Sequence, residues 1–380
     1  MADKNRLVKL VRKVLSIDSQ NPPGNEVAIA DFVAQDMRSL GLDVKTISYK
    51  KDRPNVIAVL KGSLPRKEAV REALLVTPHT DVVPVGKGWK YDPFGKDVVG
   101  SRIYGRGASD DKGNLACAME AVRALVEDGF RPRKDIILAA TADEETGSHA
   151  GIKPLLEKGV LKPRLALVLD SVDYHTIIAQ KGLFHCRIRV FGRKAHGAVN
   201  WKGINAIEQA ARIIQLLKAH AWKFPKHSRL NHPTVNVGTI SGGDKVNIVA
   251  DFCEFSVDIR FMPGMDSRAL IAQVKACAAA VTKKYELIID DLQQPYEIPE
   301  DNIYVSAFIR AAGACGKKAK LMGSDGATVI SFFQHQRIAA FATGFGKSGT
   351  LHTNDEYAEI PTLFNGARIL ERFIRDYDAL

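Results

Sequence analysis

Three apolar runs of the sequence end in acidic residues or histidine. His79-Thr80-Asp81 follows the run Leu74–Val76, Asp143-Glu144-Glu145 comes shortly after Ile137–Ala139, and Asp170 follows Leu167–Leu169. Between them the segment Gly105–Gly113 carries Asp110 and Asp111 at the start of an expected helix. Because ligands of open α/β sheets bind outside the carboxyl ends of the strands, we expect these side chains to converge.

One imidazole and five or six carboxylates on one sheet edge would repel each other unless cations lay among them. Oxygen and nitrogen ligands without a thiolate suit zinc, cobalt or manganese, and the imidazole argues against magnesium or calcium. A bridging carboxylate holds two ions roughly 3.5–4 Å apart in two-metal hydrolytic sites. The residue types therefore predict metal-assisted hydrolysis.

The elements that position these residues follow from hydrophobic patterning. Unbroken apolar runs, typical of strands covered on both faces, occupy residues 55–60, 73–77, 135–140 and 165–169. Helical spacing of apolar residues appears near Leu7–Leu15, Glu26–Leu40 and Gly113–Asp128. Alternating strands and helices indicate an α/β layered sheet.

The pattern changes at about Gly182. Alternating strands are expected at 184–191 and 252–261, with helices near 205–221 and 267–284, which is the pattern of a smaller α+β unit. After Pro295 the chain returns to a helix (304–313), a short strand (338–341) and a final helix (362–377). We therefore expect a catalytic domain formed by residues 1–181 and 295–380, with residues 182–294 inserted as a second domain.

Five segments, taken in order, resemble the motifs of a known family. They are His79-Thr80-Asp81, Gly105–Gly113, Glu144-Glu145, Asp170 and Leu351–Glu356. The family is that of the di-zinc amidohydrolases, metallopeptidase family 20, which includes acetylornithine deacetylase, succinyl-diaminopimelate desuccinylase, aminoacylase and glutamate carboxypeptidase. The resemblance covers nearly the whole chain. It implies a zinc-peptidase-like catalytic domain, with a mixed sheet flanked by helices, and a ferredoxin-like α+β insert that serves as lid and dimerisation domain.

The resemblance implies two zinc ions per chain, with cobalt or manganese as possible substitutes. His79 would bind one ion, Asp110 would bridge both, and Glu145 with His352 would bind the other. Asp170 would complete the first site, although deacetylase and desuccinylase members tend to carry Glu there. Asp173 is the competing candidate for that ligand.

Three further features belong to the metal site by resemblance. Asp81 would hydrogen-bond the ring of His79 and so fix its tautomer. A cis peptide bond is expected between Asp110 and Asp111. Glu144 resembles the general base that takes a proton from the attacking water. Without the resemblance, Glu144 would be an ordinary loop carboxylate.

The remaining candidates concern the substrate. By resemblance, His196 would reach the active site of a partner subunit and stabilise the oxyanion, which implies a homodimer. Arg260, with Asn247, would bind the α-carboxylate of the substrate, although a salt bridge on the sheet surface is an alternative. Ser324 and Gly326, at the start of an expected helix 327–333, would offer backbone N–H groups to the same carboxylate, although a plain turn explains them as well.

These residues predict a deacylase that cleaves the amide bond of an N-acyl amino acid. A dipeptidase or carboxypeptidase shares every catalytic residue and is the alternative. A protein that keeps the fold and binds ligands without catalysis is a more distant one.

Composition narrows the class of protein. Five scattered cysteines without a Cys-x-x-Cys pair indicate neither a disulfide framework nor a thiolate zinc site. No apolar stretch approaches the roughly 18 residues of a membrane span, and no signal peptide is apparent, so we expect a cytoplasmic protein without a membrane partner. The net charge of +11 suits acidic metabolites, and no aromatic-rich basic motif predicts a nucleic-acid partner.

Overall fold

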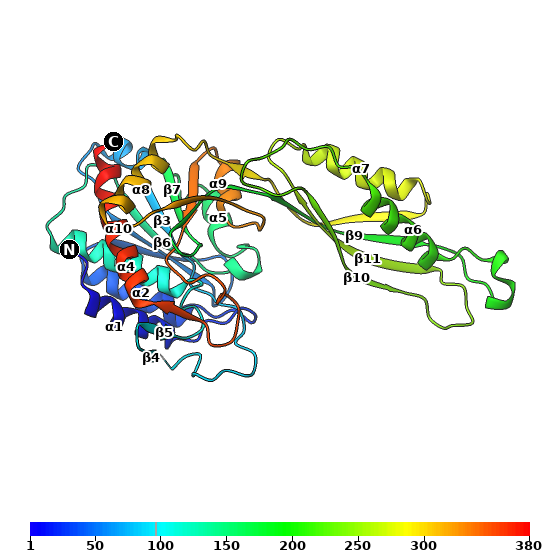
Figure 1. Ribbon diagram of the computed structural model, residues 1–380, viewed down its shortest axis with the longest axis horizontal. Coiled ribbons are helices and arrows are strands. Elements are labelled where there is room, and N and C mark those ends of the chain that lie inside the picture. The colour runs from blue at the N-terminus through cyan, green and yellow to red at the C-terminus, as the bar shows by residue number, and fades with distance from the viewer. Residues whose placement is uncertain (96) are drawn as a thin grey trace. The chain divides into compact units, whose positions relative to one another are not determined.

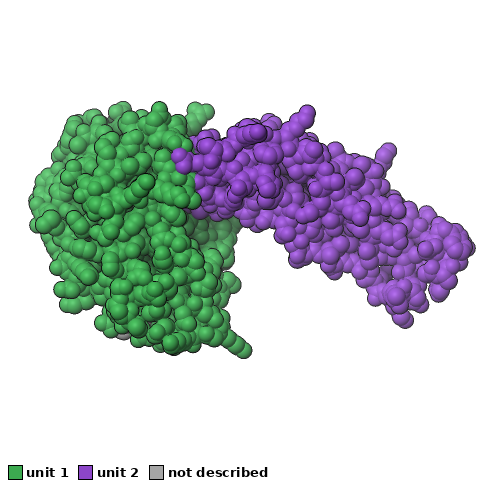
Figure 2. All heavy atoms as spheres, viewed as in Figure 1, with its two compact units in different colours: residues 1–178, 298–322, 332–380 green, residues 179–297, 323–331 purple. Residues whose placement is uncertain are grey.

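The computed structural model describes residues 1–95 and 97–380. They form two compact units, coloured separately in Figure 2. The first unit contains residues 1–178, 298–322 and 332–380, and the second contains residues 179–297 and 323–331. The expected insert, 182–294, lies within the second unit. Residues 323–331 also group with that unit, although the sequence assigned them to the last catalytic segment.

The central sheet is mixed and has nine strands among the described residues. In spatial order they are β1 (Asp43–Ser48), β2 (Pro54–Leu60), β6 (Ile136–Ala140), β3 (Leu74–Thr77), β7 (Leu165–Leu169), β15 (Ala339–Thr343), β8 (His175–Gln180) and β13 (Tyr296–Glu297), and β14 (Lys320–Ser324) also pairs with β8. The central strands β6, β3, β7 and β15 run parallel to one another. Their carboxyl ends therefore share one edge, and β3, β6 and β7 are fully buried there.

Helices cover this sheet (Figure 1). The longer ones are α1 (Lys4–Leu15), α2 (Val27–Ser39), α4 (Lys112–Glu127), α8 (Ile303–Ala314) and α10 (Ile360–Ala379), and the shorter ones are α3 (Arg66–Arg71), α5 (Ile152–Glu157) and α9 (Ile330–His335). Helix α10 packs against α4, α8 and α1, whereas α2 packs against β2. Helix α1 shows how the sequence specifies an element: the Asp3 side chain caps its first turn, and its buried residues follow helical spacing.

A small antiparallel sheet lies beside the expected site. It consists of β4 (Val98–Val99), β5 (Arg102–Tyr104) and β16 (Tyr357–Glu359), with β5 in the middle. Strand β5 leads into the Gly105–Gly113 segment, and β16 follows the segment of His352 directly. This pairing brings two segments that are far apart in sequence side by side.

The second unit is a βαββαβ arrangement. Its elements are β9 (Gly182–Phe191), the 3₁₀ segment η2 (Gly197–Lys202), α6 (Ala206–Ala219), β10 (Thr234–Gly242), β11 (Phe252–Phe261), α7 (Ser267–Ala279) and β12 (Tyr285–Gln293). The strand order β10-β11-β9-β12 is that of a ferredoxin-like sheet. Alternate residues of β9 and β11 are buried, and they form one apolar core with α6 and α7. The predicted α/β fold with a smaller α+β unit is confirmed.

One helix differs from the expectation. The helix expected at 327–333 is wrong in its bounds, because α9 begins only at Ile330. The Gln180 side chain, at the end of β8, accepts hydrogen bonds from the backbone N–H and the hydroxyl of Thr328. It also donates a hydrogen bond to the Thr328 carbonyl. Thr328 is therefore bonded to β8 and does not belong to the helix. Among the described residues, no helix is long and apolar enough to cross a membrane.

Candidate metal centre

Three of the predicted ligands meet in the first unit. His79 follows β3, Asp110 lies in the loop before α4, and Glu145 lies in the 3₁₀ turn η1 (Glu144–Thr146) after β6. One ligand atom from each lies within 4.8 Å of the others. The parallel strands β3 and β6 thus bring together residues that are 66 positions apart, as the sequence predicted.

His352 joins the same cluster. Its Nε2 atom lies 3.1 Å from Asp110 Oδ2 and 3.4 Å from Glu145 Oε1. Asp110 Oδ1 lies 3.0 Å from His79 Nε2. Each oxygen of the Asp110 carboxylate therefore faces a different imidazole, which is the arrangement expected of a carboxylate that bridges two cations.

The hydrogen bonds of His79 test whether a cation fits. Its Nδ1 lies 3.0 Å from the backbone carbonyl of Asp81, and because a carbonyl oxygen only accepts, Nδ1 must carry a proton. In the neutral ring the Nε2 lone pair then faces the Asp110 carboxylate, so that two acceptors oppose each other. The Oε1 atom of Glu145 is also buried, and no hydrogen bond reaches it within the described chain. A cation between these groups resolves both conflicts.

The pKa values of the cluster report the same excess of negative charge. Burial, followed by the charge of Asp110, raises the pKa of Asp170 to about 7. Burial and then the charge of Asp170 raise the pKa of Glu144 well above its usual value. The contacts with Asp110 and then with Glu145 raise the pKa of His352 to about 10. The cluster thus favours bound positive charge, whether protons or metal ions.

The two candidates for the remaining ligand differ in their surroundings. Asp173 accepts a hydrogen bond from the Ser348 backbone at 3.2 Å and lies 3.5 Å from the Lys347 ammonium. Asp170 is within electrostatic reach of Asp110, Glu145 and His352. The surroundings therefore favour Asp170 over Asp173.

Asp81 has a larger structural role than the sequence predicted. Its carboxylate accepts the backbone N–H groups of Glu144 and Glu145, at 3.0 and 3.1 Å, and the Asn21 side-chain amide at 2.8 Å. The distance from Asp81 Oδ1 to His79 Nδ1 is 3.6 Å, longer than a hydrogen bond, so the contact with the ring is made chiefly by the Asp81 carbonyl. Asp81 therefore holds the turn that presents Glu144 and Glu145.

The Asp110–Asp111 peptide bond is cis, as the resemblance implied. The Asp111 carboxylate accepts the His79 backbone N–H at 2.9 Å and the Asn114 side-chain amide at 2.6 Å. Asn114, which the sequence gave no reason to single out, also accepts the backbone N–H of Phe345. The first turn of α4 is thereby tied to the loop after β15.

The substrate-binding candidates belong to the second unit. His196 is exposed, and its Nδ1 accepts the Ala198 backbone N–H at 3.1 Å. The carbonyl of Asn247 accepts the N–H of Gly197 at 2.8 Å, so Asn247 lies next to His196 and not, as paired in the sequence, with Arg260. Arg260 donates two hydrogen bonds to Asp258, the surface salt bridge that was the alternative. Ser324 and Gly326 form a local turn.

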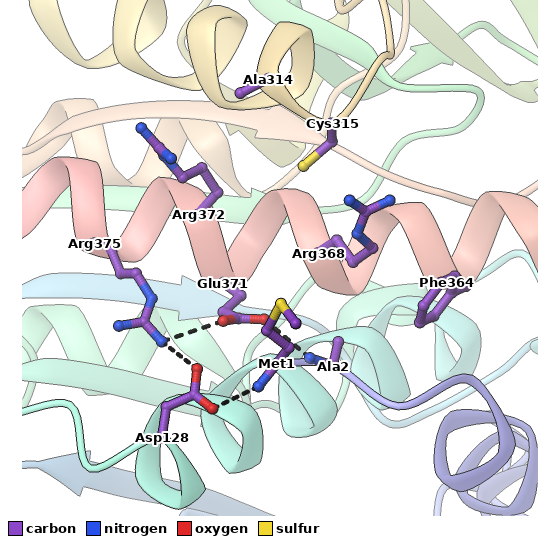
Figure 3. Close-up of a pocket in the computed structure, with 10 residues that line it drawn as sticks. All are labelled: Met1, Ala2, Asp128, Ala314, Cys315, Phe364, Arg368, Glu371, Arg372 and Arg375. Atoms are coloured by element: carbon purple, nitrogen blue, oxygen red, sulfur yellow. Dashed lines mark hydrogen bonds and ion pairs between the residues drawn. The ribbon is translucent and has the colours of Figure 1, made fainter.

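A cavity of about 730 Å³ opens elsewhere in the first unit (Figure 3). Three arginines of α10 lie around it: Arg368, Arg372 and Arg375. Arg375 pairs with Asp128 and Glu371, and Arg372 pairs with Asp376, so much of the positive charge is balanced. The cavity shares no lining residue with the metal cluster.

Comparison with known proteins identifies relatives over nearly the whole chain. The model of Peptidase family M20/M25/M40 matches residues 75–376. Acetylornithine deacetylase from Photorhabdus laumondii is 28% identical over 375 residues, which covers 95% of this chain and 91% of that protein. Acetylornithine deacetylase from Salmonella heidelberg is 31% identical over 302 residues, covering 75% of each chain.

Solved structures share the fold at lower sequence identity. The aminopeptidase PepT from Bacillus cereus has a TM-score of 0.83 and 22% identity, with complete coverage (100%) of both chains. A dinuclear metal-binding peptidase from Bacillus subtilis has a TM-score of 0.73 and 16% identity, and the match covers 98% of this chain and 97% of that one. Human carnosine dipeptidase 1 also has a TM-score of 0.73, at 17% identity, covering 99% and 95% of the two chains.

Proposed function

Because this chain belongs to peptidase family M20/M25/M40 and is a hydrolase of amide or peptide bonds, we propose that it removes the acyl group of an N-acyl amino acid with two divalent metal ions. The observation that carries the two-metal part is the Asp110 carboxylate, whose two oxygens face His79 and His352. The choice of an N-acyl amino acid rests on the relatives named acetylornithine deacetylase, one of which is matched over 95% of this chain.

We assign His79, Asp110 and Asp170 to one ion, and Asp110, Glu145 and His352 to the other. Zinc suits this donor set of imidazole and carboxylate, and cobalt or manganese would fit it as well. Bound metal ions would lower the pKa of water from about 15.7 to about 7 and polarise the scissile carbonyl.

Glu144 is the proposed general base. The Asp81 carboxylate fixes its backbone, and its pKa is raised, first by burial, which suits a group that must accept and return a proton near neutrality. Glu144 takes a proton from the attacking water and delivers it to the leaving amine. Addition of water would form the new C–O bond first and place negative charge on the former carbonyl oxygen. The C–N bond would then break, and the products are a carboxylate and a free amino acid.

We further propose that the protein works as a homodimer in which His196 of one copy stabilises the oxyanion in the other. The second unit exposes apolar side chains: Trp201, in the η2 segment after His196, is 73% exposed and Ile240, on β10, is 53% exposed. Ile248, also exposed, forms a β-bridge with His196. Among the described residues, β10 pairs with β11 on one side only. An open strand edge with apolar neighbours favours association with a second copy.

Arg260, Asn247, Ser324 and Gly326 stay the residues proposed for the substrate carboxylate, with Asn247 reaching it from beside His196 and not from beside Arg260. For Arg260 this requires that the substrate compete with Asp258 for the guanidinium. The cytoplasmic location expected from the sequence also stays a prediction.

A dipeptidase or carboxypeptidase is the second candidate. The observation that bears on it is Asp170, because the deacetylases and desuccinylases of the family tend to carry Glu at this position, whereas aminoacylase and dipeptidase relatives tend to carry Asp. Both candidates use the same metal cluster and the same base.

A substrate screen separates the two candidates. N-acetyl, N-succinyl and N-formyl amino acids are assayed beside dipeptides, with zinc or cobalt added, and chelator-treated protein serves as the control. Turnover of N-acyl amino acids in preference to dipeptides supports the deacylase. Preference for dipeptides replaces it with the peptidase, and full activity without metal contradicts both.

A further inference from the structure

The ion pair of Arg106 and Glu356 is buried beside the metal cluster. The two side chains are 2% and 0% exposed, and Arg106 Nη1 lies 2.6 Å from Glu356 Oε2. The other oxygen of Glu356 accepts the backbone N–H groups of Ser109 and Asp110, at 2.9 and 3.1 Å. The Glu356 carboxylate thus fixes the backbone of Asp110, the residue whose side chain is the proposed bridging ligand.

The same pair also holds the segment that carries His352. Arg106 Nη1 donates to the carbonyl of Thr353 at 3.2 Å, and its guanidinium lies 5.1 Å from the Trp89 ring centroid. The Gly105 N–H donates to the Glu356 carbonyl at 2.9 Å. Several hydrogen bonds therefore join residues 105–110 to residues 353–356. The first segment ends at Asp110, and the second begins directly after His352.

The segment of His352 is also held by Asn354 and Asp355, which bond to residues 87–91, but the His352 ring itself is only partly packed. Its side chain is 52% exposed, and its backbone lies in the left-handed region, with φ of 59°. The ring is therefore not held by close packing on all sides. The position of its Nε2 relative to Asp110 Oδ2 is set by the segment to which it belongs.

We propose that Arg106 and Glu356 are positioning residues that set the separation of Asp110 and His352, and so the affinity for the ion that these two residues share. The inference rests on the two-metal function proposed above. Neither residue touches a ligand atom of the cluster in its own right. They act through the backbone of Ser109 and Asp110 and through the carbonyl of Thr353.

The test is cobalt binding by the chelator-treated full-length protein. Titration with Co²⁺ is followed by visible absorption and by calorimetry, and the His352→Ala variant identifies the binding step that belongs to the ion next to His352. Glu356→Gln keeps the shape of the side chain. Its amide NH₂ group would face either Arg106 or the two backbone N–H groups, where a donor meets a donor, and its remaining oxygen is an uncharged and weaker acceptor. We expect this variant to lose about 10–100-fold in affinity at that step, as removal of outer hydrogen bonds typically causes, with an altered absorption band.

Glu120→Gln is the matched control. Glu120 is also 0% exposed and also accepts bonds from one arginine, Arg6, and one backbone amide, that of Asp3, but it joins α1 to α4. Melting temperatures of the metal-free variants measure any general loss of stability. A similar drop in cobalt affinity in Glu120→Gln would overturn the specific role of Glu356.

Other outcomes also decide the matter. Wild-type protein that takes up fewer than two ions would overturn the two-metal function and this inference with it. Two ions in wild type, with unchanged affinity in Glu356→Gln, would overturn the positioning role alone. If Glu356→Gln does not fold, Arg106→Lys replaces it: this variant keeps the charge but loses the fork that reaches Thr353 and Glu356, and wild-type affinity there would contradict the proposal.

Discussion

At the scale of single residues, the centre is defined by one carboxylate shared between two imidazoles. Asp110 faces His79 and His352, while Asp170, Glu144 and Glu145 add negative charge within a buried space. Two imidazoles cannot balance four carboxylates, and the pKa of Asp170 is raised to about 7, first by burial and then by Asp110. The electrostatics of these residues therefore favour bound positive charge in the folded protein.

Metal removal should accordingly destabilise the protein. Since ions that bind only the folded state add stability by mass action, a free concentration one hundred times Kd contributes about 2.7 kcal/mol per site. We expect chelator to lower the melting temperature and zinc or cobalt to restore it, as measured by calorimetry. An unchanged melting temperature after complete removal of metal would contradict this account.

Glu144 should matter for turnover and not for metal binding. Because Glu144→Gln cannot accept a proton, we expect kcat to fall by about 10²–10⁴-fold. Metal content, measured by elemental analysis, should stay at the wild-type value, since Glu144 is not among the assigned ligands. A variant that retains wild-type turnover would remove Glu144 from the role of base.

At the scale of elements, the site depends on loops that are anchored to helices. Helix α10 carries Gly366, and a Cβ atom added there would lie 2.2 Å from the Phe345 ring. Phe345 is fully buried, and its backbone N–H donates to Asn114 in the first turn of α4. The close approach of α10 thus supports the loop after β15, which borders the metal cluster.

Two glycine substitutions in helices should have opposite effects. Gly366→Ala forces the Phe345 ring to move and should destabilise the protein by about 1–3 kcal/mol. Gly313→Ala, in α8, meets no atom within 4 Å and should stabilise it by about 0.5–1 kcal/mol, because alanine loses less backbone entropy. Denaturant unfolding of both variants measures the difference, and equal effects would show that contact with Phe345 does not matter.

At the scale of the whole molecule, the proposed homodimer makes each active site depend on two chains. The His196→Ala and Glu144→Gln variants should each be inactive or nearly so. In a re-associated mixture, half of the dimers contain one chain of each kind, and one of their two sites is complete. We therefore expect about a quarter of wild-type activity to return, as the symmetry of a dimer requires.

Sedimentation measured on the same mixture checks the assembly itself. Activity that does not return, although mixed dimers form, would place His196 outside the partner's site. A monomer in solution would contradict the dimer altogether. The variant Ile240→Asp, which puts a charge on the exposed face of β10, should weaken the association without touching the metal cluster.

The sequence by itself determined the parts of the fold that are buried on all sides. The apolar runs of β3, β6 and β7 predicted the central strands, and the polar residues after them predicted that His79, Glu145 and Asp170 would converge. This works because a fully covered strand must be apolar throughout, and because parallel strands end at one edge. The exposed strands β1 and β10 were not predicted, since little of either is buried and no apolar run marks them.

Only the tertiary structure decided how the ligands are held. The sequence placed Glu356 in a motif and Arg106 in a glycine-rich segment, but nothing in either suggests that they meet. It likewise left open that Asp258 occupies Arg260 and that the Asp81 carboxylate fixes the backbone of Glu144. Buried polar groups take partners from distant segments, and the pairing depends on which backbone groups the completed fold leaves without a hydrogen bond.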